Sequence, residues 1–180
     1  MTVEQQAAPV AGADGPLALG VAVLTVSDTR GSADDTSGDY LVAAAGDAGH
    51  RLADRALVPD DIYRIRAVIS QWIADPRVQV VLVTGGTGFA GRDSTPEAVA
   101  VLFDKHIEGF GEMFRRLSQD EIGSSTVQSR ALAGLANRTA VFCLPGSTGA
   151  CRTGWEGILR DQLDGRHRPC NFVAVLTGRH

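Results

Sequence analysis

Residues 78–98 read VQVVLVTGGTGFAGRDSTPEA. The apolar, β-branched run Val80–Val83 is typical of a buried strand, and it leads into the small residues Gly85, Gly86, Thr87 and Gly88. Residues 94–97, STPE, combine a hydroxyl cap, a proline in the first turn and an acid near the positive helix end. A strand that leads through glycines to a helix N-terminus is a common phosphate-binding arrangement, so this stretch predicts an anion site.

The rest of the chain alternates in the same way. Apolar runs predict strands over 17–26, 51–58 and 140–144, and a further apolar run covers 172–176. Helical spacing predicts helices from Tyr40 to a glycine cap at Gly49, over 62–73, from Pro96 to Phe103, over 110–117, over 125–136 and over 155–163. This alternation predicts a three-layer α/β fold with a mostly parallel sheet and helices on both faces.

Composition and length favour one domain. The chain has 180 residues, of which 44% are hydrophobic, enough for a single buried core. We expect residues 1–16, rich in Ala, Gly, Gln and Pro, to form a flexible tail and residues 17–180 to form the domain.

Charge and cysteine content narrow the class of protein. A net charge of −4 argues against a nucleic-acid binder, which needs a concentrated basic face. No segment is long and apolar enough for a membrane span, and no secretory signal is evident. Cys143, Cys151 and Cys170 show neither zinc-ligand spacing nor an even number, so we expect reduced thiols and a cytoplasmic location.

In a parallel sheet the carboxyl ends of the strands share one edge, so loops 27–38, 58–61, 84–93 and 144–149 should converge. The sequence from Gly86 to Gly91 also fits GxGxxG, which raises a dinucleotide site as an alternative. A dinucleotide motif would open its helix within the glycines, whereas here the helix signal follows Asp93, so we take the match as accidental. A Walker loop is excluded because Arg92 and Asp93 replace its lysine and hydroxyl.

Two aspartates stand beside these loops. Asp60 and Asp93 could share Mg²⁺, which prefers one or two carboxylates together with substrate phosphates. From the residues alone, the simpler interpretation is that Asp60 is only the cap of the helix that follows it. Without a Ser-His-Asp or Cys-His set, phosphoryl or nucleotidyl transfer by positioning and electrostatics is the reaction class that the residues favour.

Several segments together resemble one family. VLVTGGTGFAGRDSTPEA, TVSDTRG, DDTSG, VPDD, FGEMFR, STVQSRALAG and LPGS are similar to the MoaB/MogA family of molybdenum cofactor biosynthesis proteins, over roughly residues 17–176. CRTGWEGI and HRPCNF resemble its protein B branch.

The resemblance implies a molybdopterin-binding fold and Mg²⁺-dependent adenylylation of molybdopterin by ATP, with release of pyrophosphate. It implies that Asp60 and Asp93 are the catalytic and metal-binding acids, and that the protein is a homotrimer or homohexamer. The nucleotide- and molybdopterin-binding residues expected on this basis are Ser27, Asp35, Ser37, Gly38, Gly85, Gly86, Thr87, Gly88, Arg92, Thr95, Pro96, Glu97, Ser129, Arg130, Pro145, Gly146 and Ser147. The alternative is a non-catalytic molybdopterin-binding or scaffold protein of the same pathway.

Overall fold

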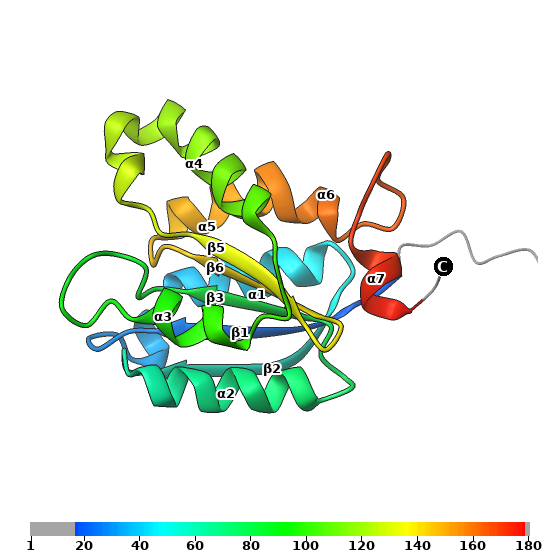
Figure 1. Cartoon of the computed structure of the whole chain (residues 1–180), viewed down its shortest axis with the longest axis horizontal. Helices are drawn as coiled ribbons and strands as arrows, with labels where there is room; N and C mark the ends of the chain where they lie inside the picture. The colour runs from blue at the N-terminus through cyan, green and yellow to red at the C-terminus, as the bar shows by residue number, and fades with distance from the viewer. Residues whose placement is uncertain (1–16, 179–180) are drawn as a thin grey trace, which may run out of the picture.

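A six-stranded sheet forms the middle layer of the fold (Figure 1). The computed structural model describes residues 17–178, so the expected tail over 1–16 lies outside the described residues. The strand order is β2-β1-β3-β6-β5-β4, in which β2, β1, β3 and β6 are parallel and the β4 and β5 pairings are antiparallel. The strands are β1 (Gly20–Val26), β2 (Arg51–Val58), β3 (Val80–Thr84), β4 (Lys105–His106), β5 (Leu132–Ala136) and β6 (Thr139–Leu144).

Helices cover both faces of this sheet, which confirms the predicted three-layer α/β class. The α-helices are α1 (Thr36–Asp47), α2 (Ile62–Ala74), α3 (Thr95–Val99), α4 (Glu108–Ile122), α5 (Thr148–Gly154), α6 (Arg160–Gln162) and α7 (Val173–Thr177). Short 3₁₀ turns are η1 (Ser32–Asp34), η2 (Ala100–Leu102) and η3 (Gly123–Gln128), and η4 (Trp155–Leu159) is a π-helical turn. In Figure 1, α2 and α3 lie on one face, and α1, α4, α5 and α6 lie on the other.

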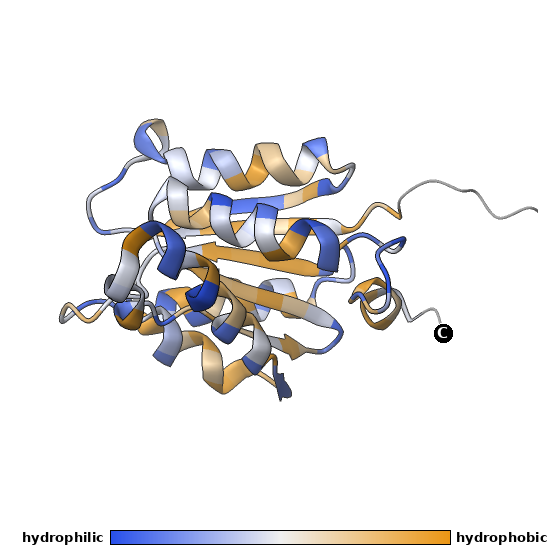
Figure 2. Ribbon diagram, turned by 90° about the horizontal axis from the view of Figure 1, so that it is seen from above, coloured by the Kyte–Doolittle hydropathy of each residue, from blue (hydrophilic) through white to orange (hydrophobic). Residues whose placement is uncertain are grey.

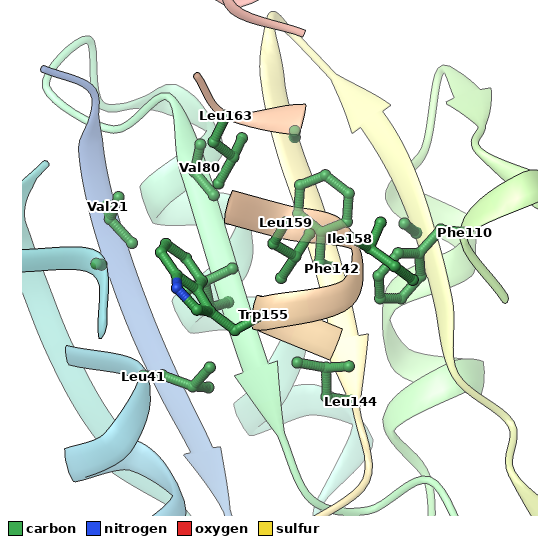
Figure 3. Close-up of a cluster of buried hydrophobic side chains, with 14 of the residues drawn as sticks. Val21, Leu41, Val80, Phe110, Phe142, Leu144, Trp155, Ile158, Leu159 and Leu163 are labelled. Atoms are coloured by element: carbon green, nitrogen blue, oxygen red, sulfur yellow. The ribbon is translucent and has the colours of Figure 1, made fainter. Parts of the chain in front are cut away.

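Each face of the sheet has its own apolar core. Figure 3 shows part of the larger one, where Trp155, Leu159 and Leu163 pack on side chains of β1, β3 and β6. The second core lies beneath α2, whose Ile65, Ile69 and Trp72 are buried. Because both faces are covered, β1, β3 and β6 are fully buried and read as unbroken apolar runs, which explains the orange centre of Figure 2.

Two sequence predictions are wrong. The segment 125–136 is not a helix: η3 ends at Gln128, and 132–136 forms strand β5, antiparallel to β6. This segment becomes a strand by pairing with β6, and local periodicity cannot reveal such a non-local pairing. Ser94 supplies no hydroxyl cap to α3, because its side chain bonds to Asp60 instead.

Other boundaries shift by a few residues. Strand β1 starts at Gly20 rather than Leu17, and the helix after Pro96 tightens to a 3₁₀ turn and ends at Leu102. The apolar run 172–176 is mostly helix α7. The expected glycine cap of α1 is present, since Gly49 follows the C-cap Ala48 with φ of 87°.

A buried ion pair joins α1 to the sheet. The Asp35 carboxylate is only 1% exposed; it accepts hydrogen bonds from the Gly38 N–H (3.0 Å) and from Thr25 Oγ1 (2.7 Å), and it pairs with Arg55 Nη2 at 2.8 Å. Burial alone would raise the pKa of Asp35, but the hydrogen bonds from Arg55, Thr25 and Gly38 outweigh it and lower the pKa below its ordinary value. Asp35 therefore caps α1 and ties it to β1 and β2.

We expect Asp35→Ala to lower the free energy of unfolding by about 3 kcal/mol at pH 7, because it leaves Arg55 without its buried partner. Urea unfolding measures this. A lowered pKa stabilises the fold above the ordinary value of 3.8, so the deficit should shrink as the pH falls below that value. The control is Asp39→Ala, which removes an exposed partner of the same arginine and should cost less than about 1 kcal/mol. Equal losses in the two variants would contradict a structural role for Asp35.

Candidate functional site

The loops at the carboxyl ends of the parallel strands surround one cavity, which confirms their predicted convergence. Its volume is about 590 Å³, within the range of small-molecule sites. The 3₁₀ turn η3 and the end of α4 complete its wall. The lining residues are Val26, Ser27, Asp28, Thr29, Arg30, Asp60, Gly85, Gly86, Thr87, Gly88, Ala90, Arg92, Asp93, Ile122, Ser125, Gln128, Ser129, Pro145 and Gly146.

Asp60 is fixed by two neighbouring loops. Its backbone N–H donates to Asp28 Oδ1 at 3.0 Å, and its own Oδ1 accepts from both the backbone N–H (3.0 Å) and the hydroxyl of Ser94. The helix cap is the next residue, Asp61, which accepts from the N–H groups of Tyr63 and Arg64. Asp60 is therefore free of the capping role that the sequence left open.

The second carboxylate oxygen of Asp60 faces the glycine turn. A Cβ at Gly86 would lie 2.6 Å from Asp60 Oδ2, and this oxygen accepts no hydrogen bond within residues 17–178. Burial raises the pKa of Asp60, and the charges of Asp93 and Asp28 raise it further, against the lowering effect of the Ser94 hydrogen bonds. A cation at this oxygen would relieve both effects.

Asp93 closes the other end of the glycine loop. Its Oδ2 accepts from the Ala90 N–H at 2.6 Å and lies 2.7 Å from the position of a Cβ at Gly88. Its Oδ1 accepts no hydrogen bond within the described part of the chain. Asp60 and Asp93 thus line one cavity, each with one carboxylate oxygen unused.

The backbone of the glycine turn is open to a ligand. Gly85 and Gly86 have φ of 102° and 65°, in the left-handed region that favours glycine. Gly85 N–H donates to Leu144 O, whereas the N–H groups of Gly86, Thr87 and Gly88 have no acceptor within residues 17–178. Such free donors can bind phosphate oxygens. The helix begins only at Thr95, after the glycines, as the rejection of a dinucleotide motif requires.

Two arginines hold the loops rather than stand free in the cavity. Arg92 Nε pairs with Asp28 Oδ2 at 3.0 Å, and its Nη2 donates to the backbone oxygen of Asp60 at 3.2 Å. It therefore links three of the four loops. The sequence predicts Arg92 at the site but not Asp28. The position of Asp28 just after the end of β1 could have suggested it.

Arg130 clamps the glycine loop. Its Nε donates to Gly88 O at 2.9 Å and its Nη2 to Asp93 O at 2.7 Å, while Nη1 pairs with Glu97. Its guanidinium carbon also lies 5.1 Å from the ring centroid of Phe89. One side chain thus fixes both ends of the segment 88–93, and Arg130 itself is not among the lining residues.

The structure brings together only part of the expected binding set. Ser27, Gly85, Gly86, Thr87, Gly88, Arg92, Ser129, Pro145 and Gly146 line the cavity together with Asp60 and Asp93. The remaining residues lie outside the lining and support it: Asp35, Ser37 and Gly38 at the start of α1, Thr95, Pro96 and Glu97 in α3, Arg130 before β5, and Ser147 as the cap of α5.

Seven cavity residues were missed besides Asp28: Val26, Thr29, Arg30, Ala90, Ile122, Ser125 and Gln128. Val26 ends β1, and Ala90 belongs to the glycine loop itself. Thr29 and Arg30 follow the end of β1, where position alone could have suggested them. Ile122, Ser125 and Gln128 lie where α4 turns into η3, a segment that carries no recognisable motif.

Residues 17–178 contain no group of three or more His, Cys, Asp or Glu side chains placed to hold a metal ion. Substrate oxygens would have to complete the coordination of any metal at Asp60 and Asp93.

None of the helices within 17–178 combines the length and apolar character needed to cross a bilayer.

Known proteins are similar to this chain in both sequence and fold. Residues 22–165 match the family described as the probable molybdopterin binding domain. Molybdenum cofactor biosynthesis protein B of Escherichia coli K12 is 59% identical over 152 residues, 84% of this chain and 89% of that protein. A crystal structure of a molybdenum cofactor biosynthesis protein B has a TM-score of 0.81 at 40% identity, covering 83% of this chain and 94% of that one.

A second solved structure is that of the tungsten cofactor synthesizing protein MoaB from Pyrococcus furiosus. It has a TM-score of 0.75 at 36% identity and covers 82% of this chain and 94% of its own. The family match and the fold place the chain in the class described as the probable molybdopterin binding domain. Within that class, the chain belongs to the molybdenum cofactor biosynthesis protein B family.

We expect Asp60→Asn to leave the fold at least as stable as wild type at pH 7. The amide oxygen can still accept from Ser94, while the buried charge near Asp93 and Asp28 is removed. A raised pKa destabilises the charged native state as the pH rises above the ordinary value of 3.8, so any gain should vanish below that pH. Thermal unfolding between pH 3 and pH 8 measures this. A large loss of stability at pH 7 would show that the carboxylate is a structural group.

We expect Arg130→Gln to increase hydrogen exchange of the bonded loop amides of Ala90, Asp93 and Ser94 by roughly tenfold or more. The reason is that two charge-assisted bonds to the loop are lost. Exchange of β1 and β3 should not change. The matched control is Arg115→Gln, since Arg115 bonds to Ser129 O and Ala131 O but not to the glycine loop. Unchanged exchange in the loop of Arg130→Gln would rule out the clamp.

Proposed function

We propose that this protein is a molybdopterin adenylyltransferase, which transfers AMP from ATP to molybdopterin with Mg²⁺. The observation that carries the proposal is the pair Asp60 and Asp93, each with an unused carboxylate oxygen in the cavity that the glycine turn also lines. The similarity to molybdenum and tungsten cofactor biosynthesis proteins supports the pathway, and the two acids support the reaction.

The proposed reaction needs no covalent enzyme intermediate. A terminal phosphate oxygen of molybdopterin attacks the α-phosphorus of ATP, a new P–O bond forms, and the bond between the α-phosphorus and the β-bridging oxygen breaks. Pyrophosphate leaves with that oxygen. A phosphate monoester is largely dianionic at neutral pH, so the nucleophile requires no general base. The protein must instead bring two anions together and stabilise the developing charge.

The donor set at the acidic side of the cavity fits Mg²⁺. This ion is commonly held by one or two carboxylates, with substrate phosphates and water in its remaining positions. Asp60 and Asp93 would hold it, and it would supply charge neutralisation at the triphosphate. Arg92 and Ser94 keep Asp60 in place, and the Ala90 N–H does the same for Asp93.

The free N–H groups of the glycine turn are suited to the phosphates of the nucleotide. They belong to Gly86, Thr87 and Gly88, next to both acids, and the Arg130 clamp fixes the loop from outside the cavity. Donors already held in position cost no reorganisation during the reaction, which is how such loops contribute to catalysis.

We also propose that the protein works as a homotrimer or homohexamer. Several large apolar side chains are exposed on the single chain, and association could bury them: Phe89, Val101, Met113, Ile122 and Val127. Light scattering coupled to size-exclusion chromatography distinguishes these states, and a monomeric mass at micromolar concentration would contradict the proposal.

Incubation of the protein with molybdopterin, ATP and Mg²⁺ tests the reaction directly. We expect equal amounts of pyrophosphate and adenylylated pterin, both abolished by EDTA. Tight pterin binding without product, under conditions in which a known adenylyltransferase is active, would favour the non-catalytic binding or scaffold role instead.

We predict that Asp93→Ala lowers the turnover rate roughly 10²-fold or more, because it removes a carboxylate that stabilises charge at the phosphates. Asp93→Asn is the informative companion, since its amide oxygen can still accept from the Ala90 N–H and keep the loop closed. Both variants should lose turnover to a similar extent. Full activity of Asp93→Asn would show that Asp93 only shapes the loop.

A further inference from the structure

Arg30 is the cavity residue with the least explained role. It follows β1, and three hydrogen bonds fix it, two within its own loop 27–38 and one to loop 144–149. Its N–H donates to Ser27 Oγ at 3.0 Å, and its Nη1 donates to Gly146 O at 2.8 Å and to Ser37 Oγ at 3.1 Å. These bonds hold a half-buried guanidinium at the cavity wall.

The charge of Arg30 is not balanced locally. Arg92 pairs with Asp28, and Arg130 with Glu97, but no carboxylate of residues 17–178 lies within salt-bridge distance of the Arg30 guanidinium. The other charged residues of the cavity lining are Asp28, Asp60, Asp93 and the paired Arg92. Among the described residues of the lining, Arg30 is therefore the unneutralised cation.

Its free donors have the geometry of an anion fork. A guanidinium has five N–H donors, and the two contacts above use Nη1 alone. Nε and Nη2 donate to no acceptor within residues 17–178. Because no side-chain N or O atom of the described residues is both buried and unsatisfied, these two nitrogens are accessible to solvent. These two nitrogens form the edge of arginine that binds two oxygens of a phosphate at once.

The two anionic substrates need different counter-ions. The triphosphate of ATP carries Mg²⁺ in the proposed reaction, and the acids Asp60 and Asp93 suit that ion. The terminal phosphate of the pterin has no such companion, yet it must approach the α-phosphate. A fixed cation offsets that repulsion.

We propose that Arg30 binds the terminal phosphate monoester of molybdopterin. This inference rests on the proposed function for its substrate, but its test uses binding alone. It separates the cavity into a carboxylate side for the metal and nucleotide and an arginine site for the nucleophile. Ser37 and Gly146, which accept hydrogen bonds from its Nη1, become positioning residues for Arg30.

The experiment compares two pterins on three proteins by titration calorimetry under anaerobic conditions. The pterins are molybdopterin and molybdopterin from which the terminal phosphate has been removed. The proteins are wild type, Arg30→Gln and Arg30→Lys. We expect Arg30→Gln to bind molybdopterin about tenfold to a hundredfold more weakly than wild type, with Arg30→Lys in between because it keeps the charge but lacks the fork.

Removal of the phosphate should erase the difference: the dephosphorylated pterin should bind to all three proteins with equal affinity. The affinity for ATP with Mg²⁺ should change less than about twofold. The matched control is Arg51→Gln, an equal charge change at the amino end of β2, the end of the sheet opposite to the cavity, and it should alter no affinity. Thermal unfolding checks that each variant is folded. If Arg30→Gln is not folded, the comparison of Arg30→Lys with wild type still tests the proposal.

Equal losses for both pterins, unchanged affinity for molybdopterin, or a loss confined to ATP would each overturn the proposal. The result is separable from that of the turnover assay. If wild type forms no pyrophosphate but shows the phosphate-dependent difference, the adenylylation fails while the role of Arg30 stands. If pyrophosphate forms and Arg30→Gln binds molybdopterin as tightly as wild type, the adenylylation stands while the role of Arg30 fails.

Discussion

Parallel pairing of β1 with β3 and of β3 with β6 is the constraint on which the rest of the molecule depends. Parallel neighbours cannot be joined by a tight turn, so each connection crosses a face of the sheet and brings a helix with it. Because both faces are covered, the central strands are apolar throughout. The polar residues of the cavity therefore lie in the loops at one edge of the sheet. The cavity, its acids and its glycine turn follow from that placement.

Within that edge, Asp60, Arg92 and Arg30 are each held by a loop other than their own, whereas the Asp93 carboxylate is held by the Ala90 N–H of its own loop. Asp28 and Ser94 position Asp60, Arg92 joins Asp28 to Asp60, and Arg30 reaches Gly146. Hydrogen bonds between loops replace the regular pairing that the strands lose where they end. The consequence is a preorganised site in which few side chains need to move when a ligand binds.

How far the sequence predicts this structure depends on how local each signal is. Strands β2 and β3 and helix α2 were predicted because their apolar pattern is contained in the segment itself. Strand β5 was not, since its small residues become a strand only by pairing with β6. The acids Asp60 and Asp93 were identified by their place beside loops. The sequence could not decide between Asp60 and its neighbour Asp61 as the cap of α2, and the structure shows that Asp61 is the cap. Arg30 and Arg130 have similar sequence signals, and only tertiary contacts separate a cavity arginine from a clamp.

The Arg130 clamp has a consequence for sequence variation. It holds Gly88 and Asp93 by their backbone oxygens, which every residue type possesses. Between these two points, Phe89 is 69% exposed, Ala90 is exposed, and a Cβ at Gly91 would meet no neighbouring atom within 4 Å. Phe89 contacts the Arg130 guanidinium and Ala90 lines the cavity, so within this segment a side chain can be added at position 91 without displacing Asp93. The outer surface of this loop can therefore vary at this position during evolution while the acidic site beside it stays unchanged.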